Sequence, residues 1–198
     1  MSIREHDHRH TRLTLQIITE SLHGKARILE IKTERITDYL NQGYVVVVAG
    51  FQGASLSHNG SLEITTLGRG GSDTSAVALS TALGAEKCEI YTDVPGVLTT
   101  DPRIVENAKL LDLISCEEML ELASVGASVL HPRAVEIARN YGIKLYVKSS
   151  ETHKGGTLLE SKLKPLKLKR GSLLQQTSGM CSPLKLTGDP KRKSLDRK

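Results

Sequence analysis

The sequence predicts an α/β fold built in layers, and two features of the chain carry this prediction. A helical stretch over 33–41, with its apolar residues on one face, leads directly into the β-branched, apolar run 44–49. A run that is apolar on both faces is typical of a central parallel strand covered on both sides. The second feature is a glycine-rich loop at 68–73, which opens an alanine-rich helix over 74–83. Helices that alternate with buried strands indicate a layered α/β domain.

The remaining elements follow from local patterns. Ser115 is expected to start a helix, because Glu118 stands at the capping-box position behind it. Pro132 is expected to start another helix, which Gly142 ends. The predicted helices cover 115–123 and 132–141, and the predicted strands cover 15–19, 26–31, 64–67 behind a hairpin, 89–92 and, as the last strand, 143–149.

Length and charge divide the chain into three parts. Its 198 residues, of which 38% are hydrophobic, suffice for one packed core. Residues 161–198 hold 11 Lys and Arg against two Asp and are interrupted by Pro and Gly, which predicts a basic, disordered tail. Residues 1–12 are polar and charged, which predicts a solvated leader. The expected domain is therefore 13–160.

Composition also excludes several classes of protein. The longest apolar run is far shorter than the ~20 residues that span a bilayer, and the N-terminus has no apolar signal core, so we expect a cytoplasmic protein without a membrane partner. Three cysteines without CxxC spacing indicate neither a disulfide framework nor a zinc site, and we predict no metal site. With one Phe and five Tyr, the chain shows no aromatic platform for nucleic acid.

The loop 68–73, which reads GRGGSD, predicts an anion-binding site. Glycines let backbone N–H groups approach an anion, and the helix behind the loop directs its unpaired N–H groups and positive dipole end to the same place. Arg69 adds donors that match a carboxylate or a phosphate, and Asp73 can cap the helix, hold a lysine or order a metal. The loop is neither a Walker A motif nor a dinucleotide fingerprint. A structural turn before a capped helix is the alternative.

A second loop, 93–103, leaves the carboxyl end of the strand 89–92. Ligands of open α/β sheets bind at such strand ends. Thr92, Asp93 and Arg103 supply donors, acceptors and a cation suited to a ribose and a phosphate chain. An ordinary capped turn is the alternative interpretation.

Six strings occur along the chain in this order: GFQG at 50–53, ITTLGRGGSDTSA at 64–76, YTDVPG at 91–96, TTDPR at 99–103, EEMLELA at 117–123 and VLHPRAVE at 129–136. They closely resemble motifs of bacterial aspartate kinases, and the resemblance extends from about residue 13 to residue 159. It implies the amino acid kinase (carbamate kinase-like) fold, an incomplete three-layer α/β/α sandwich around a parallel-rich sheet.

The resemblance also implies an activity. An aspartate kinase transfers the γ-phosphoryl group of ATP to the side-chain carboxylate of L-aspartate and yields 4-phospho-L-aspartate, which leads to lysine, threonine and methionine. The implied cofactor is ATP with Mg²⁺. By this resemblance Arg69 would hold the α-carboxylate of L-aspartate, together with Gly70, Gly71 and Ser72, and Asp73 would organise the site. The catalytic candidates are Arg69 and Asp73.

A nucleotide site is implied in the same way. Thr92 and Asp93 would meet the adenine and ribose side of ATP, and Arg103 would be the cation for its phosphates. Leu98 stands where many relatives have tyrosine and Ser128 where many have lysine, so we expect weakened ATP binding. The further nucleotide-binding candidates are Leu98, Thr99, Thr100, Asp101, Pro102, Ser128 and Val129.

Parts of the family pattern are missing from this sequence. No Lys-Phe-Gly-Gly-Thr-Ser segment precedes residue 13, and the basic tail stands where the family has ACT domains. We therefore expect feeble activity at best, no feedback control through ACT domains, and a homo-oligomer or association with a chain that supplies the missing N-terminal strand. The alternative is a non-catalytic aspartate kinase-like subunit or remnant that binds ligand or an intact kinase partner.

Two other functions stay open at this point. One is a kinase of the same family that acts on glutamate, uridylate or carbamate, although the string around Arg69 argues against it. The other is an adaptor whose basic tail binds nucleic acid or an anionic membrane, and such binding would fall steeply with salt.

Overall fold

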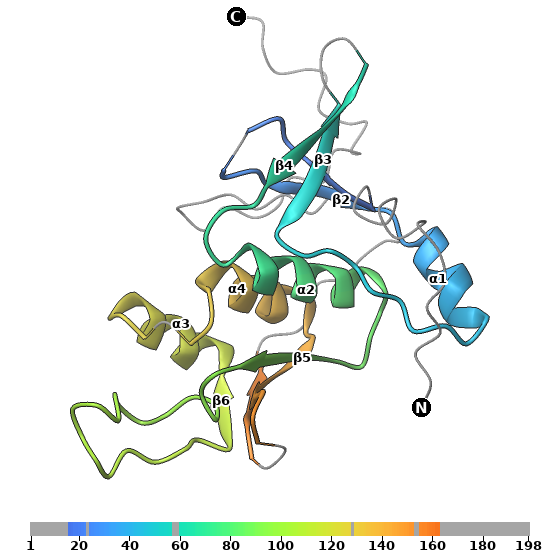
Figure 1. Ribbon diagram of the computed structural model, residues 1–198. Helices are drawn as coiled ribbons and strands as arrows, with labels where there is room; N and C mark the ends of the chain where they lie inside the picture. The colour runs from blue at the N-terminus through green and yellow to red at the C-terminus, as the bar shows by residue number, and fades with distance from the viewer. Residues whose placement is uncertain (1–15, 23, 57–59, 128, 153–154, 163–198) are drawn as a thin grey trace, which may run out of the picture.

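The structure is a computed structural model that describes residues 16–22, 24–56, 60–127, 129–152 and 155–162. The predicted leader 1–12, Ser128 and the tail beyond residue 162 lie outside the described residues. In the described part, eight strands form two four-stranded sheets, accompanied by four helices (Figure 1). None of these described helices has the length and apolarity that crossing a bilayer demands.

The first sheet, sheet A, contains both parallel and antiparallel pairs. β1 and β2 are antiparallel, β1 and β3 are parallel, and β3 and β4 form the predicted hairpin, with Ala54 opposite Ile64. Across the sheet the strands are β2 (Ile28–Ile31), β1 (Ile17–Thr19), β3 (Gln52–Leu56) and β4 (Leu62–Thr66).

The second sheet, sheet B, is also mixed. β5 is parallel to β7 and β6 is parallel to β8, whereas β7 and β8 are antiparallel. In β7, Leu145 and Val147 are buried and their neighbours are more exposed, so one face packs and the other faces outward. Across the sheet the strands are β5 (Lys87–Thr92), β7 (Lys144–Ser149), β8 (Thr157–Glu160) and β6 (Leu113–Ser115).

The predicted helices are confirmed. Ser115 and Glu118 form the predicted capping box: the Ser115 hydroxyl accepts the Glu118 N–H at 3.2 Å, and the Glu118 carboxylate accepts the Ser115 N–H at 2.9 Å. Gly142 ends the last helix in the left-handed conformation, with φ 67°. The helices are α1 (Glu34–Asn41), α2 (Gly71–Ala82), α3 (Cys116–Ser124) and α4 (Pro132–Tyr141).

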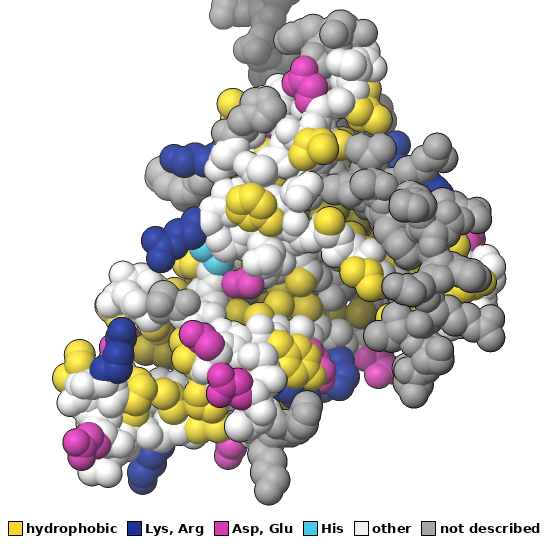
Figure 2. Space-filling model, viewed as in Figure 1, with side chains coloured by type: hydrophobic (Ala, Val, Ile, Leu, Met, Phe, Trp, Pro, Cys, Tyr) yellow, Lys and Arg dark blue, Asp and Glu magenta, His cyan; other side chains and the backbone are white. Residues whose placement is uncertain are grey.

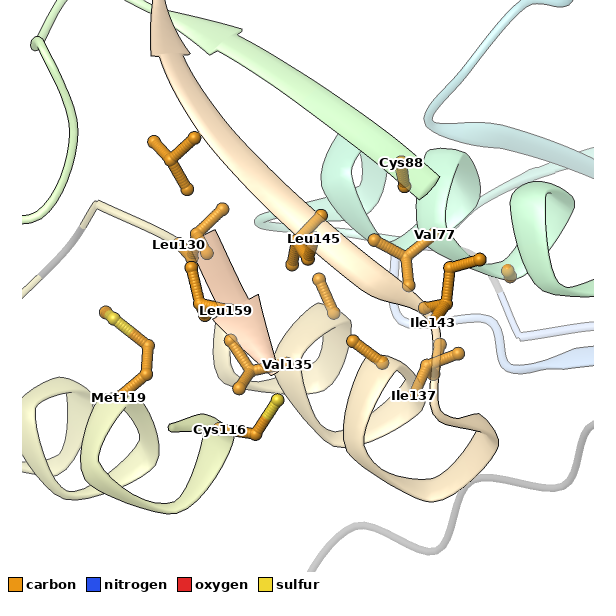
Figure 3. Packing of buried hydrophobic residues seen from close by; sticks show 14 of the residues in the cluster. Val77, Cys88, Cys116, Met119, Leu130, Val135, Ile137, Ile143, Leu145 and Leu159 are labelled. Carbon is orange, nitrogen blue, oxygen red and sulfur yellow. The ribbon is translucent and has the colours of Figure 1, made fainter. Parts of the chain in front are cut away.

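The hydrophobic core packs the helices on the inner face of sheet B (Figure 3), and the same cluster extends to Ile17, Ile28 and Ile31 of sheet A. Val77 of α2, Val135 of α4, Leu145 of β7 and Leu159 of β8 are fully buried, and Met119 of α3 closes one side. Burial of an aliphatic side chain of this size contributes about 1.5–3 kcal/mol. These contacts therefore fix α2 and α4 on sheet B and set where both helices begin.

The arrangement of the strands differs from the expected single parallel-rich sheet. The predicted α/β class is confirmed, but the described strands form two mixed sheets, and Figure 1 shows α2 and α4 between them. The antiparallel pairs have a local cause. The β3–β4 and β7–β8 pairs are joined by short connections, which favour antiparallel pairing.

The predicted central strand over 44–49 is wrong. The segment has no regular secondary structure, and Val45 and Val47 are 78% and 71% exposed. A strand is held by hydrogen bonds to a neighbouring strand, and none of the described strands pairs with this segment. Composition predicts the extended, apolar character of such a run but not its partner.

Three described strands lie outside the strands predicted from the sequence, and β3, the first arm of the hairpin, is one of them. The other two are short. β8 follows the strand that was expected to be the last, and β6 directly precedes α3. With four and three residues, they are too short to show the alternation that identifies a strand. β1 and β2 are likewise shorter than the predicted strands 15–19 and 26–31.

Candidate functional site

The glycine-rich loop 68–73 connects β4 to α2. Gly68 and Gly70 adopt left-handed conformations, with φ 79° and 67°. The Gly71 N–H donates to the Gly68 carbonyl at 2.9 Å, and the Thr74 N–H donates to the Gly70 carbonyl at 3.0 Å. The predicted loop that opens a helix is therefore confirmed, and its two left-handed positions favour glycine.

Both left-handed glycines also lie where another segment approaches closely. A Cβ on Gly68 would lie 2.3 Å from the carbonyl oxygen of Gly24, and a Cβ on Gly70 would lie 2.1 Å from Cγ of His131. Such distances are far inside van der Waals contact. The absence of a side chain therefore serves packing as well as backbone conformation.

The loop presents a cation and the start of α2 to solvent. Arg69 and Ser72 are exposed, and Asp73 is partly buried in the first turn of α2. Among the described residues no side chain caps α2, and the Gly71 N–H is used within the loop, so the N–H groups of Ser72 and Asp73 are the ones available to an anion. A guanidinium beside such N–H groups suits a carboxylate or a phosphate.

Phe51 holds the loop from the side of β3. It is the only non-glycine residue of the described segments with a positive φ, 69°. Its N–H donates to the Ser75 hydroxyl at 3.2 Å, and its carbonyl accepts the Leu67 N–H at 2.9 Å. Its ring lies so close to Gly71 that a Cβ there would be 2.9 Å from Cδ2. The segment before β3 is thereby docked on both α2 and the loop.

The start of α4 holds the loop from another side, which sequence reasoning missed. The Arg133 guanidinium donates to the Leu67 carbonyl at 2.9 Å and to the Ala26 carbonyl at 3.4 Å, and the His131 ring lies against Gly70. The sequence predicts where α4 begins. It does not indicate that the beginning of α4 contacts the loop 68–73.

The second loop begins at the carboxyl end of β5. α2 and β5 are consecutive and run in opposite directions, so the start of α2 and the end of β5 lie at the same end of the domain (Figure 1). The Thr92 hydroxyl donates to the Asp93 carboxylate at 3.0 Å, and the Thr92 carbonyl accepts the Ser150 N–H at 2.7 Å. The fold therefore brings both predicted loops to one end.

The base of the second loop is held by Thr157 of β8. Its buried hydroxyl accepts the Val97 N–H at 2.8 Å and donates to the Leu111 carbonyl at 2.6 Å. Further out, the Thr99 N–H donates to the Lys109 carbonyl at 2.9 Å, so the loop continues as an irregular hairpin. Its outer part thus depends on bonds within the loop.

Arg103 is paired with Asp101. Its Nε donates to Oδ1 at 3.0 Å and its Nη2 to Oδ2 at 2.7 Å, and the Arg103 side chain is 87% exposed. These hydrogen bonds lower the pKa of Asp101 to about 2 and raise the pKa of Arg103. The predicted phosphate-binding cation is therefore accessible but already has a carboxylate partner.

The other predicted nucleotide residues lie on the same loop or near α4. Ser128 is outside the described residues, so the expected effect of its replacing a lysine stays a prediction. Leu98, Asp101 and Val129 are partly buried, and Thr99, Thr100 and Pro102 are exposed. No group of three or more His, Cys, Asp or Glu side chains able to hold a metal ion occurs in the part of the chain that the structure describes.

Comparison with known proteins identifies the family. The amino acid kinase family profile matches residues 4–149. The chain belongs to the amino acid kinase family. It is 62% identical over 147 residues to an aspartokinase of Bacillus sp. (strain MGA3), a match that covers 74% of this chain and 35% of that protein. Aspartokinase 2 of Bacillus subtilis (strain 168) is 60% identical over 144 residues, which cover 73% of this chain and 34% of that protein. This amino acid kinase chain spans about a third of the length of these relatives.

Solved structures of the amino acid kinase family agree with this assignment. The chain matches aspartate kinase from Synechocystis with TM-score 0.61 and 57% identity, over 76% of this chain and 24% of that one. It matches E. coli aspartokinase III in complex with aspartate and ADP with TM-score 0.67 and 38% identity. This match covers 77% of this chain and 34% of that one. Carbamate kinase from Giardia lamblia, at 18% identity and TM-score 0.53 over 74% and 60%, shows the fold alone. The predicted fold and the resemblance to aspartate kinases are therefore confirmed.

Proposed function

We propose that this chain carries the substrate loop and part of the nucleotide site of an aspartate kinase. Its reaction is the transfer of the γ-phosphoryl group of ATP to the side-chain carboxylate of L-aspartate, in the cytoplasm, at the entry to lysine, threonine and methionine synthesis. The observation that carries the proposal is the exposed Arg69 on a loop packed from three sides at the uncapped start of α2. The 62% identity to an aspartokinase supports the choice of substrate.

The substrate loop has a distinct task for each residue. Arg69 binds the α-carboxylate of L-aspartate through its guanidinium, because a planar fork of donors matches a carboxylate. The backbone of Gly70 and Gly71, with Ser72, lines the same position at the start of α2. Asp73, in the first turn of α2, organises the site. Its carboxylate would help to hold the Mg²⁺ that enters with ATP, since proteins typically bind this ion with one or two carboxylates and the phosphates of the substrate.

The nucleotide lies along the second loop. Thr92 and Asp93 meet the adenine and ribose side, and the segment 98–103 meets the phosphates, with Ser128 and Val129 on the α4 side. An exposed ion pair such as Asp101 with Arg103 is weak, so a triphosphate can compete with Asp101 for the guanidinium.

Phosphoryl transfer demands mainly positioning and charge stabilisation from the protein. A side-chain oxygen of L-aspartate attacks the γ-phosphorus, the bond from that phosphorus to the bridging oxygen of ADP breaks, and ADP leaves with the electron pair. MgADP and 4-phospho-L-aspartate are the products. The two loops at one end of the domain would hold the two substrates on either side of this transfer.

The test is calorimetric titration of the purified chain with MgATP and then with L-aspartate, paired with a coupled assay of ADP formation. Binding of both ligands with feeble or absent turnover is the expected result. L-Glutamate, UMP and carbamate serve as competing substrates for other amino acid kinase activities. Binding of one of them in place of L-aspartate would contradict the proposed substrate.

A matched pair of variants sharpens the titration. Arg69→Gln removes a charge-assisted hydrogen bond, typically about 1.5–3 kcal/mol, so L-aspartate should bind roughly 10- to 100-fold more weakly. Arg35→Gln removes another exposed arginine, on α1, and should leave binding unchanged. Equal behaviour of the two variants would exclude Arg69 as the substrate's partner.

A second candidate is a non-catalytic subunit that associates with an intact kinase or with a chain that supplies another strand. The exposed apolar side chains at 44–51 and over sheet A favour it, and Figure 2 shows hydrophobic side chains at the end formed by sheet A. An apolar, extended segment without a paired strand invites association, including with a second copy. Light scattering of the chain alone and a pull-down with an intact aspartate kinase separate these outcomes.

A further inference from the structure

His131 joins the starts of two helices. It is the residue before α4, in extended conformation with φ −74° and ψ 132°, and its Nδ1 accepts the Arg133 N–H at 3.3 Å. A ring nitrogen that accepts a hydrogen bond carries no proton, so in the neutral ring Nε2 bears it. The side chain is thereby fixed to the first turn of α4.

The imidazole of His131 lies directly against the residue that precedes α2. A Cβ on Gly70 would lie 2.1 Å from Cγ and 2.3 Å from both Cβ and Cδ2 of His131. The ring therefore occupies the space that a side chain on Gly70 would fill. Because α2 and α4 also pack against each other in the core, this contact joins the N-terminal ends of two packed helices.

Charged groups from both helices surround the imidazole. Burial is the main cause that lowers the pKa of His131, and Arg133 and Arg69 lower it further, whereas Asp73 and Glu136 raise it. Arg69 and Asp73, the two catalytic candidates of the loop, thus lie within electrostatic reach of the ring. The neutral ring is the form that the surroundings favour.

In the chain, Arg69 lies between Leu67 and Gly70, and the start of α4 contacts both of these residues. Arg133 binds the carbonyl of Leu67 on one side of Arg69, and His131 contacts Gly70 on the other. We propose that His131 is a positioning residue of the substrate loop, whose ring holds Gly70 in place and so directs Arg69 towards the carboxylate of the substrate. The inference rests on the proposed function, since it assumes that Arg69 binds L-aspartate.

The test separates the contact of the His131 ring with Gly70 from the role of His131 as the N-cap of α4. His131→Asn keeps an acceptor of a type that favours the position before a helix, but it removes the ring. Asn140→Ala, at the other end of α4, is the control. The measurements are the thermal midpoint, the Kd of L-aspartate and of MgATP, and amide hydrogen exchange of residues 68–73 without ligand.

In His131→Asn we expect faster exchange across 68–73, a Kd of L-aspartate weakened about tenfold, a Kd of MgATP changed less than twofold, and a thermal midpoint close to that of the control. Unchanged exchange overturns the inference, whatever the Kd. Faster exchange with an unchanged Kd of L-aspartate also overturns it, because the ring would then support only the fold.

Failure of the proposed function gives a different result. If the unaltered chain does not bind L-aspartate at all, the proposed substrate is wrong. The exchange comparison then decides alone whether His131 positions the loop.

Discussion

The two candidate loops lie at the same end of the domain but are held in different ways. The loop 68–73 is fixed by Phe51, His131 and Arg133, which come from distant parts of the chain. The second loop, 93–103, is anchored by Thr157, which also binds the returning chain at Leu111, and the outer part of this loop is held by bonds such as that from Thr99 to Lys109. A loop held by packed tertiary contacts is preorganised, whereas a loop held by short-range surface bonds opens easily. The first is therefore suited to orient a small substrate, and the second to adapt to a larger one.

The largest effect should come from filling the space under the first loop. Gly70→Ala adds a Cβ at φ 67°, 2.1 Å from the His131 ring, whereas Gly84→Ala adds one at φ 64° with no atom within 4 Å. The left-handed backbone alone costs about 1–2 kcal/mol, and overpacking adds about 1–3 kcal/mol. Urea unfolding of both variants should therefore show a clearly larger loss for Gly70→Ala. Equal losses would mean that the ring moves aside without cost and that the first loop is not tightly held.

The second loop should be sensitive mainly at its base. Thr157→Val leaves the N–H of Val97 and the carbonyl of Leu111 without their buried partner, at a cost of about 1–3 kcal/mol. Thr99→Val makes the same change on the exposed part of the loop and should cost less than about 0.5 kcal/mol. Thermal unfolding compares the two. A similar loss from both changes would show that the outer part of the loop is held as firmly as its base.

Acid should affect the two loops in different pH ranges. The pKa of His131 lies below its ordinary value of 6.5 because of burial, so the unfolded chain takes up this proton first and stability falls as the pH drops below about 6.5. Asp101 has a pKa of about 2 against an ordinary value of 3.8. Its contribution to folding stability is therefore lost only as the pH falls from about 4 towards 2.

Between pH 7 and pH 5 amide exchange, corrected for its intrinsic pH dependence, should therefore rise at 68–73 and stay constant at 98–103. The rise should vanish in His131→Asn. Its persistence there would assign the pH response to another group.

The smallest effect should come from breaking the surface ion pair of the second loop. Asp101→Asn removes the partner of Arg103, whose side chain is 87% exposed, so the thermal midpoint should not change measurably. Glu89→Gln is the comparison, because Glu89 is 23% exposed and accepts hydrogen bonds from both Lys87 and Lys148 on sheet B. Glu89→Gln should therefore lower the thermal midpoint more than Asp101→Asn does. A larger effect at Asp101 would show that the ion pair holds the loop.

Much of the fold was predictable because its signals are local. The capping box at Ser115, Pro132 at the start of α4 and the glycines before α2 each act within one turn of the chain. The same holds for the loop 68–73, whose residue types by themselves indicate an anion site. The apolar run 44–49 has an equally strong local pattern, yet it failed as a predictor, because pairing depends on a neighbour that the run does not encode.

The family, the helices and the residue types of both loops can be inferred from the sequence, since they depend on neighbouring residues and on recognisable strings. The division of the strands into two sheets, the pairing of Arg103 with Asp101 and the contacts of His131 and Arg133 with the loop around Arg69 become visible only in the folded chain. The reason is physical: Gly70 and His131 are distant in the chain, and they meet only because the packing of α2 on α4 brings the two helix starts together.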